Sequence, residues 1–458
     1  MWMSELPPFV PFFAAALLAL VARGWLRAAL MLATPVLGGL HLWFGVPAGT
    51  MLSVPLLDFE LVLMRADRLS LLFGYLFHIA AFIAMVFALH VRERTQTVAG
   101  LLYAGSALGA VFAGDLITLF IFWELLAITS VFLIWARRTE RALRAGQRYL
   151  IIQVTSGVLL LAGALVHYHE SGSLAFDYIG LESISGTLIF IAFGIKCAFP
   201  FLHNWLTDAY PEATPTGTVF LSAFTTKVAV YSLARGFPGT ELLVYIGAVM
   251  TCFPIFYAVI ENDLRRVLAY SMINQIGFMV CGVGIGTALA LNGAVAHAFN
   301  DVIFKGLLFM TMGAVMYRTG KINATDLGGS TCESLGFATG TLSCASDCLT
   351  IDTSACETCT AGQYHCNGNE VMECDPGPPS QWVSQNPATI CDAANGFACD
   401  ATSGTCVDLA PIGNTPPTTS GELYSYAVFQ TTNSPFMGGT GIASYGDLLY
   451  VNRSGAYL

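Results

Sequence analysis

Long runs of apolar residues recur along the first part of the chain, separated by short polar stretches. A helix needs roughly 20 apolar residues to cross the ~30 Å hydrocarbon core of a bilayer, and these runs approach or reach that length. The pattern predicts an all-α polytopic membrane protein with about eleven transmembrane helices. We expect them at residues 7–22, 28–46, 69–90, 97–113, 116–136, 149–167, 186–206, 218–235, 241–260, 267–287 and 289–316.

The segment between the second and third predicted helices has a different pattern. Residues 51–66 alternate between apolar and polar side chains, a period of two that is typical of β-strands. We expect a short hairpin here, on the extracytoplasmic side of the membrane.

Beyond about Gly329 the long apolar runs stop, and Ser, Thr, Gly, Asn, Pro and Cys dominate. No later run is long enough to span a bilayer. We therefore predict three parts. These are a transmembrane domain at 1–329, a cysteine-rich module at 330–410, and a Pro/Thr-rich linker that leads into a β-rich segment at 411–458.

Charge changes at the same place. From Ser330 onward the chain carries twelve acidic residues and one basic residue, Arg453, whereas the net charge of the whole chain is −10. The first part is therefore close to neutral. The two parts look like polypeptides of unlike origin, and we interpret the boundary near 329–332 as a gene fusion or a sequence-assembly join.

Arginine and lysine are distributed unevenly over the predicted loops. One set of alternate loops carries thirteen of them, and the other set carries only Arg65, Arg68 and Arg235. Because loops rich in positive charge remain in the cytoplasm, we expect the N-terminus outside the cell. With eleven helices, the chain beyond Lys321 then begins in the cytoplasm.

Three lysines and a glutamate lie inside the predicted spans, where each ion costs roughly 2.5–3.5 kcal/mol. Glu124 lies in the middle of its span and must be paired or protonated there. Lys196 precedes Pro200 by four residues, and proline removes the N–H that the Lys196 carbonyl would accept. A broken helix with an ionisable residue at the break is typical of polar sites at mid-depth. A structural hydrogen bond for Glu124 and a simple kink at Pro200 are the alternatives.

The other intramembrane lysines suggest a path for protons. Lys227 lies about one and a half turns into the next span, although it could also extend to the nearer interface. His297, Asp301 and Lys305 recur at i, i+4 and i+8, so they share one face of a helix. A lone histidine on an apolar face is usually part of the core, but three ionisable groups in register favour a proton-transfer wire.

Three motifs carry a resemblance to a known family. The segment FWE ending at Glu124, the run KCAFPFLHNWLTDAYPEATP at 196–215 and the run NDLRRVLAYSMINQIG at 262–277 occur in that order. They resemble the antiporter-like membrane subunits of proton-pumping NADH:quinone oxidoreductase (complex I) and of multisubunit cation/proton antiporters. The resemblance covers residues 1 to about 329.

The resemblance implies a fourteen-helix fold with two inverted five-helix repeats. It also implies a relay in which Glu124 pairs with Lys196, Lys227 connects two half-channels, and His297 and Lys305 continue the path. Asp301 stands where some relatives have histidine. The chain departs from the family pattern at Thr325, before the twelfth span, so the fold expected is a truncated one with an incomplete inverted repeat. We expect translocation to be impaired by that truncation.

Ten of the thirteen cysteines lie between residues 332 and 406. An even number at this density is typical of a disulfide framework. The stretch from Cys366 to Cys406 resembles a repeat of secreted surface proteins of myxobacteria. Zinc binding through Cys356 and Cys359 is the alternative, although no second pair completes a four-ligand site. The disulfide candidates are Cys332, Cys344, Cys348, Cys356, Cys359, Cys366, Cys374, Cys391, Cys399 and Cys406.

The location of this tail is in conflict with its chemistry. The charge rule places it in the cytoplasm, where disulfides do not persist, whereas its cysteines suit the exterior. The conflict is a further reason to interpret the chain as two joined polypeptides.

The leading hypothesis is therefore proton translocation, with or without Na⁺, by a multi-pass subunit of the bacterial inner membrane. Its partners would be other membrane subunits of a respiratory or antiporter complex and the lipid bilayer. The alternative is a membrane-anchored surface protein that binds its partner through the cysteine-rich tail. We expect no cofactor, metal or nucleic acid, because no dinucleotide-binding glycine loop, haem motif or iron–sulfur spacing occurs.

Overall fold

The computed structural model describes residues 6–56 and 59–324, and beyond them a series of short segments. These segments are 339–340, 343–344, 351–352, 356–357, 363–367, 370–375, 381–391, 397–400, 403–408, 442–445 and 448–451. The chain divides into two compact units, Met1–Gly329 and Ser330–Leu458.

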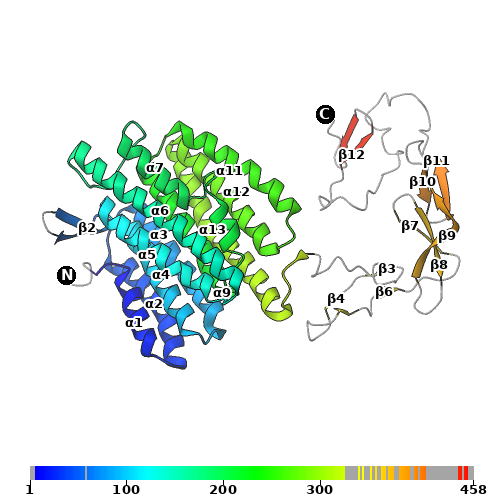
Figure 1. The fold of residues 1–458 in the computed structure, drawn as a ribbon, viewed down its shortest axis with the longest axis horizontal. Helices are drawn as coiled ribbons and strands as arrows, with labels where there is room; N and C mark the ends of the chain where they lie inside the picture. Colours follow the sequence, from blue (N-terminus) through cyan, green and yellow to red (C-terminus); the bar gives the residue numbers. More distant parts are fainter. Residues whose placement is uncertain are drawn as a thin grey trace. The chain divides into compact units, whose positions relative to one another are not determined.

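The first unit is a bundle of α-helices (Figure 1). Their bounds are α1 (Val10–Val21), α2 (Trp25–Gly45), α3 (Arg68–Phe87), α4 (Arg94–Phe112), α5 (Leu116–Trp135), α6 (Glu140–Ser171), α7 (Ile184–Lys196), α8 (Asn204–Ala209), α9 (Pro215–Ala223), α10 (Thr225–Gly236), α11 (Glu241–Ile260), α12 (Leu264–Ile285) and α13 (Ala288–Thr319). A short 3₁₀ turn, η1 (Ala88–His90), extends α3.

The predicted helical membrane fold is confirmed. Within the described residues up to 324, nine helices are long and apolar enough to cross a membrane, with α9 and α10 together forming one of them. Two of the eleven predicted windows contain only shorter apolar helices, α1 and α7. The spans α6 and α13 are longer than predicted, at 32 residues each, because polar residues extend the helices beyond their apolar stretch.

The first helix break lies where the seventh span was predicted to be interrupted. α7 ends at Lys196, and α8 begins only at Asn204. Between them Ala198 and Phe201 adopt the left-handed conformation, with φ of 59° and 67°. Such values are unfavourable for residues with a Cβ, so the surrounding packing must impose them.

The second break was not predicted. The span expected at 218–235 consists of α9 and α10, which meet at Phe224 with φ −107° and ψ −66°. A side chain from another helix contacts the backbone at this break, where the N–H of Thr225 donates to the Tyr103 hydroxyl of α4 at 3.1 Å. That hydroxyl replaces the helical acceptor one turn earlier. Lys227 therefore lies in the first turn of α10 and not in mid-helix.

The hairpin predicted at 51–66 is present as β1 (Met51–Leu56) and β2 (Phe59–Arg65), which pair antiparallel. It is tied to the connection between α4 and α5. The Gly114 N–H donates to the Val62 carbonyl at 2.9 Å, and the Val62 N–H donates to the Asp115 carboxylate at 2.7 Å. Asp115 also caps α5, so one side chain fixes both the hairpin and the start of that helix.

The described part of the second unit consists of short strands. Its largest sheet has the order β7-β8-β9, and the remaining strands pair in twos. The strands are β3 (Thr339–Gly340), β4 (Ser343–Cys344), β5 (Ile351–Asp352), β6 (Cys356–Glu357), β7 (Tyr364–Asn367), β8 (Glu370–Asp375), β9 (Gln381–Ile390), β10 (Phe397–Asp400), β11 (Thr405–Asp408), β12 (Ile442–Tyr445) and β13 (Leu448–Val451).

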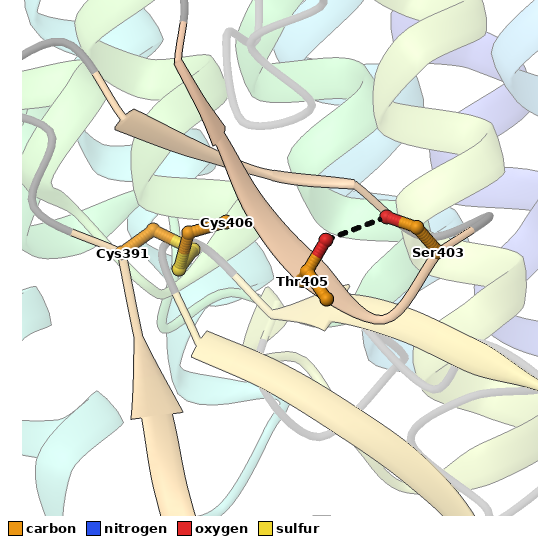
Figure 2. Close-up of a disulfide and its surroundings, with 4 residues drawn as sticks. All are labelled: Cys391, Ser403, Thr405 and Cys406. Atoms are coloured by element: carbon orange, nitrogen blue, oxygen red, sulfur yellow. Dashed lines mark hydrogen bonds between the residues drawn. A yellow bond between two sulfur atoms is a disulfide. The ribbon is translucent and has the colours of Figure 1, made fainter.

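A disulfide joins Cys391, which directly follows β9, to Cys406 within β11 (Figure 2). Close to it, the Ser403 and Thr405 hydroxyls form a hydrogen bond of 2.8 Å. Cys374 is also disulfide-bonded. The candidates Cys332, Cys348 and Cys359 lie outside the described residues, and so do the side chains of Cys344, Cys356, Cys366 and Cys399.

Candidate functional site

The end of α7 places Lys196 inside the bundle, where its side chain is fully buried. Its Nζ donates to the carbonyl oxygen of Trp123 at 2.9 Å and lies 5.0 Å from the centre of the indole ring. The expected ion pair with Glu124 is not formed, because no ion pair within 4 Å involves Glu124 in the described part of the chain. The Oε1 atom of Glu124 is buried there without a hydrogen-bond partner. The amine donates to the neutral carbonyl of Trp123, the residue before Glu124.

The second break brings together a lysine and a carboxylate that are distant in the sequence. Lys227 Nζ lies 2.7 Å from Asp301 Oδ2, and both side chains are fully buried. The contact is close without the alignment of a hydrogen bond, so both Asp301 oxygens lack a hydrogen-bond partner among the described residues. Lys227 also donates to the Ser222 carbonyl at 3.1 Å. That carbonyl is available because the helix breaks two residues later.

His297 and Lys305, predicted to share one face of α13 with Asp301, contact different partners. Lys305 is buried and donates to the Ser271 hydroxyl of α12 at 2.5 Å. His297 is half-buried, and its ring lies 6.1 Å from that of Phe278. No hydrogen bond joins His297 to Asp301 or Lys305 in the part of the chain that the structure describes. The periodicity predicted their common helix but not their different partners.

Several buried hydroxyls near the second break were missed by the sequence analysis. Tyr103 and Thr225 share a hydrogen bond of 2.6 Å, and Tyr149 and Ser130 share one of 2.7 Å. The Tyr210 hydroxyl is buried without a hydrogen-bond partner among the described residues. Tyrosines in apolar runs have the sequence signature of ordinary core residues, so no signal in the chain marked them.

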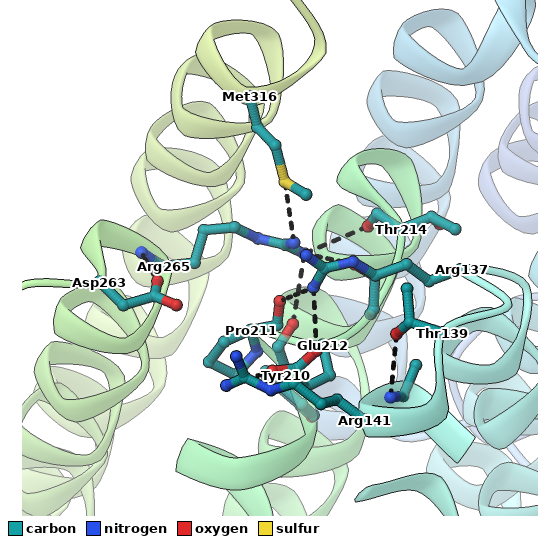
Figure 3. A network of polar contacts seen from close by, with 12 residues as sticks. Arg137, Thr139, Arg141, Tyr210, Pro211, Glu212, Thr214, Asp263, Arg265 and Met316 are labelled. Carbon is teal, nitrogen blue, oxygen red and sulfur yellow. Dashed lines mark hydrogen bonds and ion pairs between the residues drawn. The ribbon is translucent and has the colours of Figure 1, made fainter. Parts of the chain in front are cut away.

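A buried arginine, also missed, organises one end of the bundle. The Arg265 guanidinium of α12 donates to the carbonyls of Ala213 and Thr214 at 2.9 and 3.3 Å, to the Thr218 hydroxyl, and to the sulfur of Met316. Figure 3 shows this side chain reaching from α12 toward α13 and the connection between α8 and α9. Arg265 therefore holds in place the segment that links the two helix breaks.

Beside Arg265, an acidic side chain bridges two arginines. Glu212 lies 3.2 Å from Arg137 and 3.0 Å from Arg141 (Figure 3). A pocket of about 270 Å³ opens here, lined by these three residues together with Asp263 and Arg266 among others. These arginines belong to the loop set that is rich in positive charge, so loops of that set meet at one end.

Loops of the other set meet around Asp67. Its carboxylate lies 2.7 Å from Arg235 and 3.7 Å from Arg65, and it caps α3 by accepting from the Ser70 N–H at 2.9 Å. Burial raises the pKa of Asp67, but the Ser70 hydrogen bond and the charges of Arg235 and Arg65 outweigh it and hold the pKa below its usual value of 3.8.

The Asp67 contacts lead to a test of pH dependence. Because the folded-state pKa is lowered, the charge of Asp67 stabilises the protein above the unfolded-state pKa, and this stability is lost as the pH falls through the folded-state value. We expect Asp67→Asn, which keeps the cap, to lower the melting temperature at pH 7. The difference from the wild type should shrink below about pH 3.8. Asp67→Ala should cost about 1 kcal/mol more, through loss of the cap. Melting curves that differ equally at all pH values would contradict the role of the charge.

Comparison with known proteins finds relatives of the helical unit. Residues 113–330 match the family model described as NADH:quinone oxidoreductase/Mrp antiporter, transmembrane region. This segment is similar to the transmembrane domain of that family, and we refer to it as the antiporter-type domain. It contains all six ionisable residues of the predicted relay and both helix breaks.

Relatives of the antiporter-type domain occur in several complexes. A Na⁺/H⁺ antiporter subunit of Alkalihalophilus pseudofirmus is 30% identical over 241 residues, which are 48% of this chain and 49% of the relative. An NADH-quinone oxidoreductase subunit of Desulforudis audaxviator is 32% identical over 267 residues, 52% of this chain and 53% of the relative. The chain spans about half the length of these curated relatives.

A solved structure has a similar fold. The Mrp complex from Dietzia sp. aligns with a TM-score of 0.61 and 27% identity, covering 69% of this chain and 38% of the matched chain. The predicted resemblance of the helical unit to complex I and Mrp subunits is thus confirmed for the antiporter-type domain. The likeness of the tail to secreted surface proteins stays a prediction.

Proposed function

We propose that the antiporter-type domain moves protons across the membrane as a subunit of a respiratory or cation/proton antiporter complex. The observation that supports this most strongly is the Lys227–Asp301 pair, fully buried beside a helix break. Charges at this depth are expensive and are found where they line a path for ions. Two further buried lysines, Lys196 and Lys305, lie on neighbouring helices.

In the proposed relay, each lysine passes its proton on when its amine loses the acceptor that it contacts. Glu124 and Lys196 receive the proton at the first break, Lys227 and Asp301 hold it at the second, and Lys305 carries it on through Ser271 and toward His297. An amine that loses its counter-ion in an apolar site holds its proton less tightly. Relatives named as Na⁺/H⁺ antiporter subunits make Na⁺ a second candidate ion.

We also propose an orientation and partners for the domain. The arginine-rich end, with Arg137, Arg141 and Arg266, would face the cytoplasm, and the end with the hairpin and Asp67 would face outward. This orientation puts the N-terminus outside. The partners would be other membrane subunits of the complex, since the relatives are named as subunits.

The full chain in proteoliposomes tests this function. With a pH-sensitive dye inside and an imposed membrane potential, we expect proton uptake above that of empty vesicles. Lys196→Met should reduce it roughly 10-fold, which corresponds to a barrier raised by about 1.4 kcal/mol. Arg144→Gln is the matched control, because it removes an exposed charge whose only ion pair among the described residues is with Glu140. Uptake equal to that of empty vesicles, or unchanged by Lys196→Met, would end the proposal. An imposed Na⁺ gradient distinguishes the two candidate ions.

The Cys391–Cys406 disulfide favours a second candidate function, a membrane-anchored surface protein that binds through its tail. Disulfides persist outside the cytoplasm. A tail that carries them does not suit the cytoplasmic position that the charge rule predicts, which favours the interpretation of the two units as joined polypeptides. A thiol titration of the unfolded, unreduced protein tests this candidate. Ten blocked cysteines would support it, whereas ten free ones would exclude it.

A further inference from the structure

Lys196 has two possible acceptors on adjacent residues of α5. Its Nζ donates to the Trp123 carbonyl at 2.9 Å and lies 5.0 Å from the centre of the Trp123 ring. The next residue is Glu124, whose carboxylate forms no ion pair in the described part of the chain. Trp123 and Lys196 are both fully buried. The relay proposed above uses Glu124 and leaves Trp123 without a role.

The Trp123 ring is fixed in this position from two neighbouring helices. Its Nε1 donates to the Ser156 hydroxyl of α6 at 2.9 Å, and that hydroxyl donates to the Ala192 carbonyl of α7 at 2.7 Å. On the α7 side the ring lies 5.1 Å from that of Phe193. A tryptophan held through its N–H presents its ring face in one direction. Here that face meets the amine, and tryptophan binds cations better than any other side-chain ring.

The Glu124 carboxylate contacts α6 at Gly157, the residue after Ser156. Gly157 follows Ser156, and a Cβ at this position would overlap the Oε1 atom of Glu124. The carboxylate therefore occupies the space that the missing side chain leaves. Ser156 and Gly157 thus hold Trp123 and Glu124 as two separate acceptors, and the flexible lysine side chain can turn from one to the other.

We infer that Trp123 is a positioning residue of the relay, whose carbonyl and ring face give the Lys196 ammonium a second resting position when it leaves Glu124. An ammonium in an apolar interior needs an acceptor in every position it occupies. A carbonyl and an aromatic face satisfy it without a formal negative charge, so the amine can return or pass its proton on. This inference rests on the proposed function, since it assigns a role within that relay.

Fluorinated tryptophans at position 123 test the ring face directly. Fluorine withdraws electron density from the ring and weakens cation binding, whereas the shape of the side chain and the carbonyl are almost unchanged. We expect proton uptake by the full chain in proteoliposomes to fall stepwise with one, two and three fluorines, to a total of roughly 3-fold. The same series at Trp135, at the far end of α5, should have no effect. Uptake that is independent of fluorine at position 123, in a protein that Lys196→Met inactivates, would overturn the inference.

A spectroscopic measurement separates this inference from the proposed function. In the full chain labelled with 5-fluorotryptophan, Trp123→Phe identifies the ¹⁹F signal of Trp123. We expect Lys196→Met to shift that signal and Lys305→Met to leave it in place, with the Trp135 signal as the internal control. If the chain transports no protons but the signal shifts, the lysine contact stands and the proposed function fails. A Trp123 signal that ignores Lys196→Met overturns the inference whatever the transport result.

Discussion

Lys227→Met should destabilise the helical unit by about 3–5 kcal/mol, the usual cost of removing one partner of a buried ion pair. The Asp301 carboxylate would remain fully buried, with no other ion pair within 4 Å among the described residues. It cannot reach water, and it would have to take up a proton or remain charged in an apolar site. Unfolding by denaturant in detergent micelles measures the loss. We also expect proton uptake in proteoliposomes to fall roughly 100-fold, as for the loss of a proton-transfer group.

A second variant separates stability from transport. Lys227→Met combined with Asp301→Leu replaces the whole pair with apolar groups, a change that is often neutral or stabilising by about 1–4 kcal/mol. The double variant should therefore regain the stability of the wild type without regaining transport. If it is as unstable as Lys227→Met alone, the cost does not come from an unpaired charge. If it transports normally, the pair is not part of the relay.

Gly157→Ala should displace Glu124 and reduce both stability and transport. The added methyl group would occupy the position of the Glu124 Oε1 atom, so either the carboxylate or α6 must move. Overpacking of this kind typically costs about 1–3 kcal/mol. Because Glu124 is the proposed partner of Lys196 in the relay and would be displaced, we expect proton uptake to fall at least roughly 10-fold. Denaturant unfolding and proteoliposome uptake measure the two effects.

The matched control is Gly293→Ala on α13, where the added Cβ meets nothing within 4 Å. Alanine is the better helix former by up to about 1 kcal/mol, so this variant should be neutral or slightly stabilised. Combining Gly157→Ala with Glu124→Ala tests the collision itself, because the shorter side chain leaves room for the methyl group. Stability should then recover, although transport should not. Strictly additive losses would show that Gly157 and Glu124 do not compete for the same space.

Much of the helical unit could be predicted because membrane insertion is determined by local properties. A span needs a certain length of apolar residues, and the sequence displays that length directly. The break beside Lys196 was also local, since Pro200 removes a backbone donor at a known distance along the helix. The alternation at 51–66 predicted the hairpin for a similar reason. Each of these features depends on neighbours in the chain and not on the fold.

The partners of the buried charges could not be predicted in this way. Neither proline nor glycine marks the second break at Phe224, where Tyr103 from α4 accepts the Thr225 N–H. Asp301 was assigned to a stripe with His297 and Lys305, yet its ion pair is with Lys227, on another helix. Arg265 had the signature of a cytoplasmic loop charge and lies buried against the α8–α9 connection.

The sequence alone therefore determined which segments are apolar enough to cross the membrane, where the first helix break lies, and which side chains bring charge into the apolar interior. Only the tertiary structure decided which acceptor each charge meets. Lys196, for example, donates to the Trp123 carbonyl and not to the Glu124 carboxylate. The physical reason is the range of the interactions. Hydrophobic length and proline act along one helix, whereas a buried amine is satisfied by whatever group the packing of other helices brings within about 3 Å.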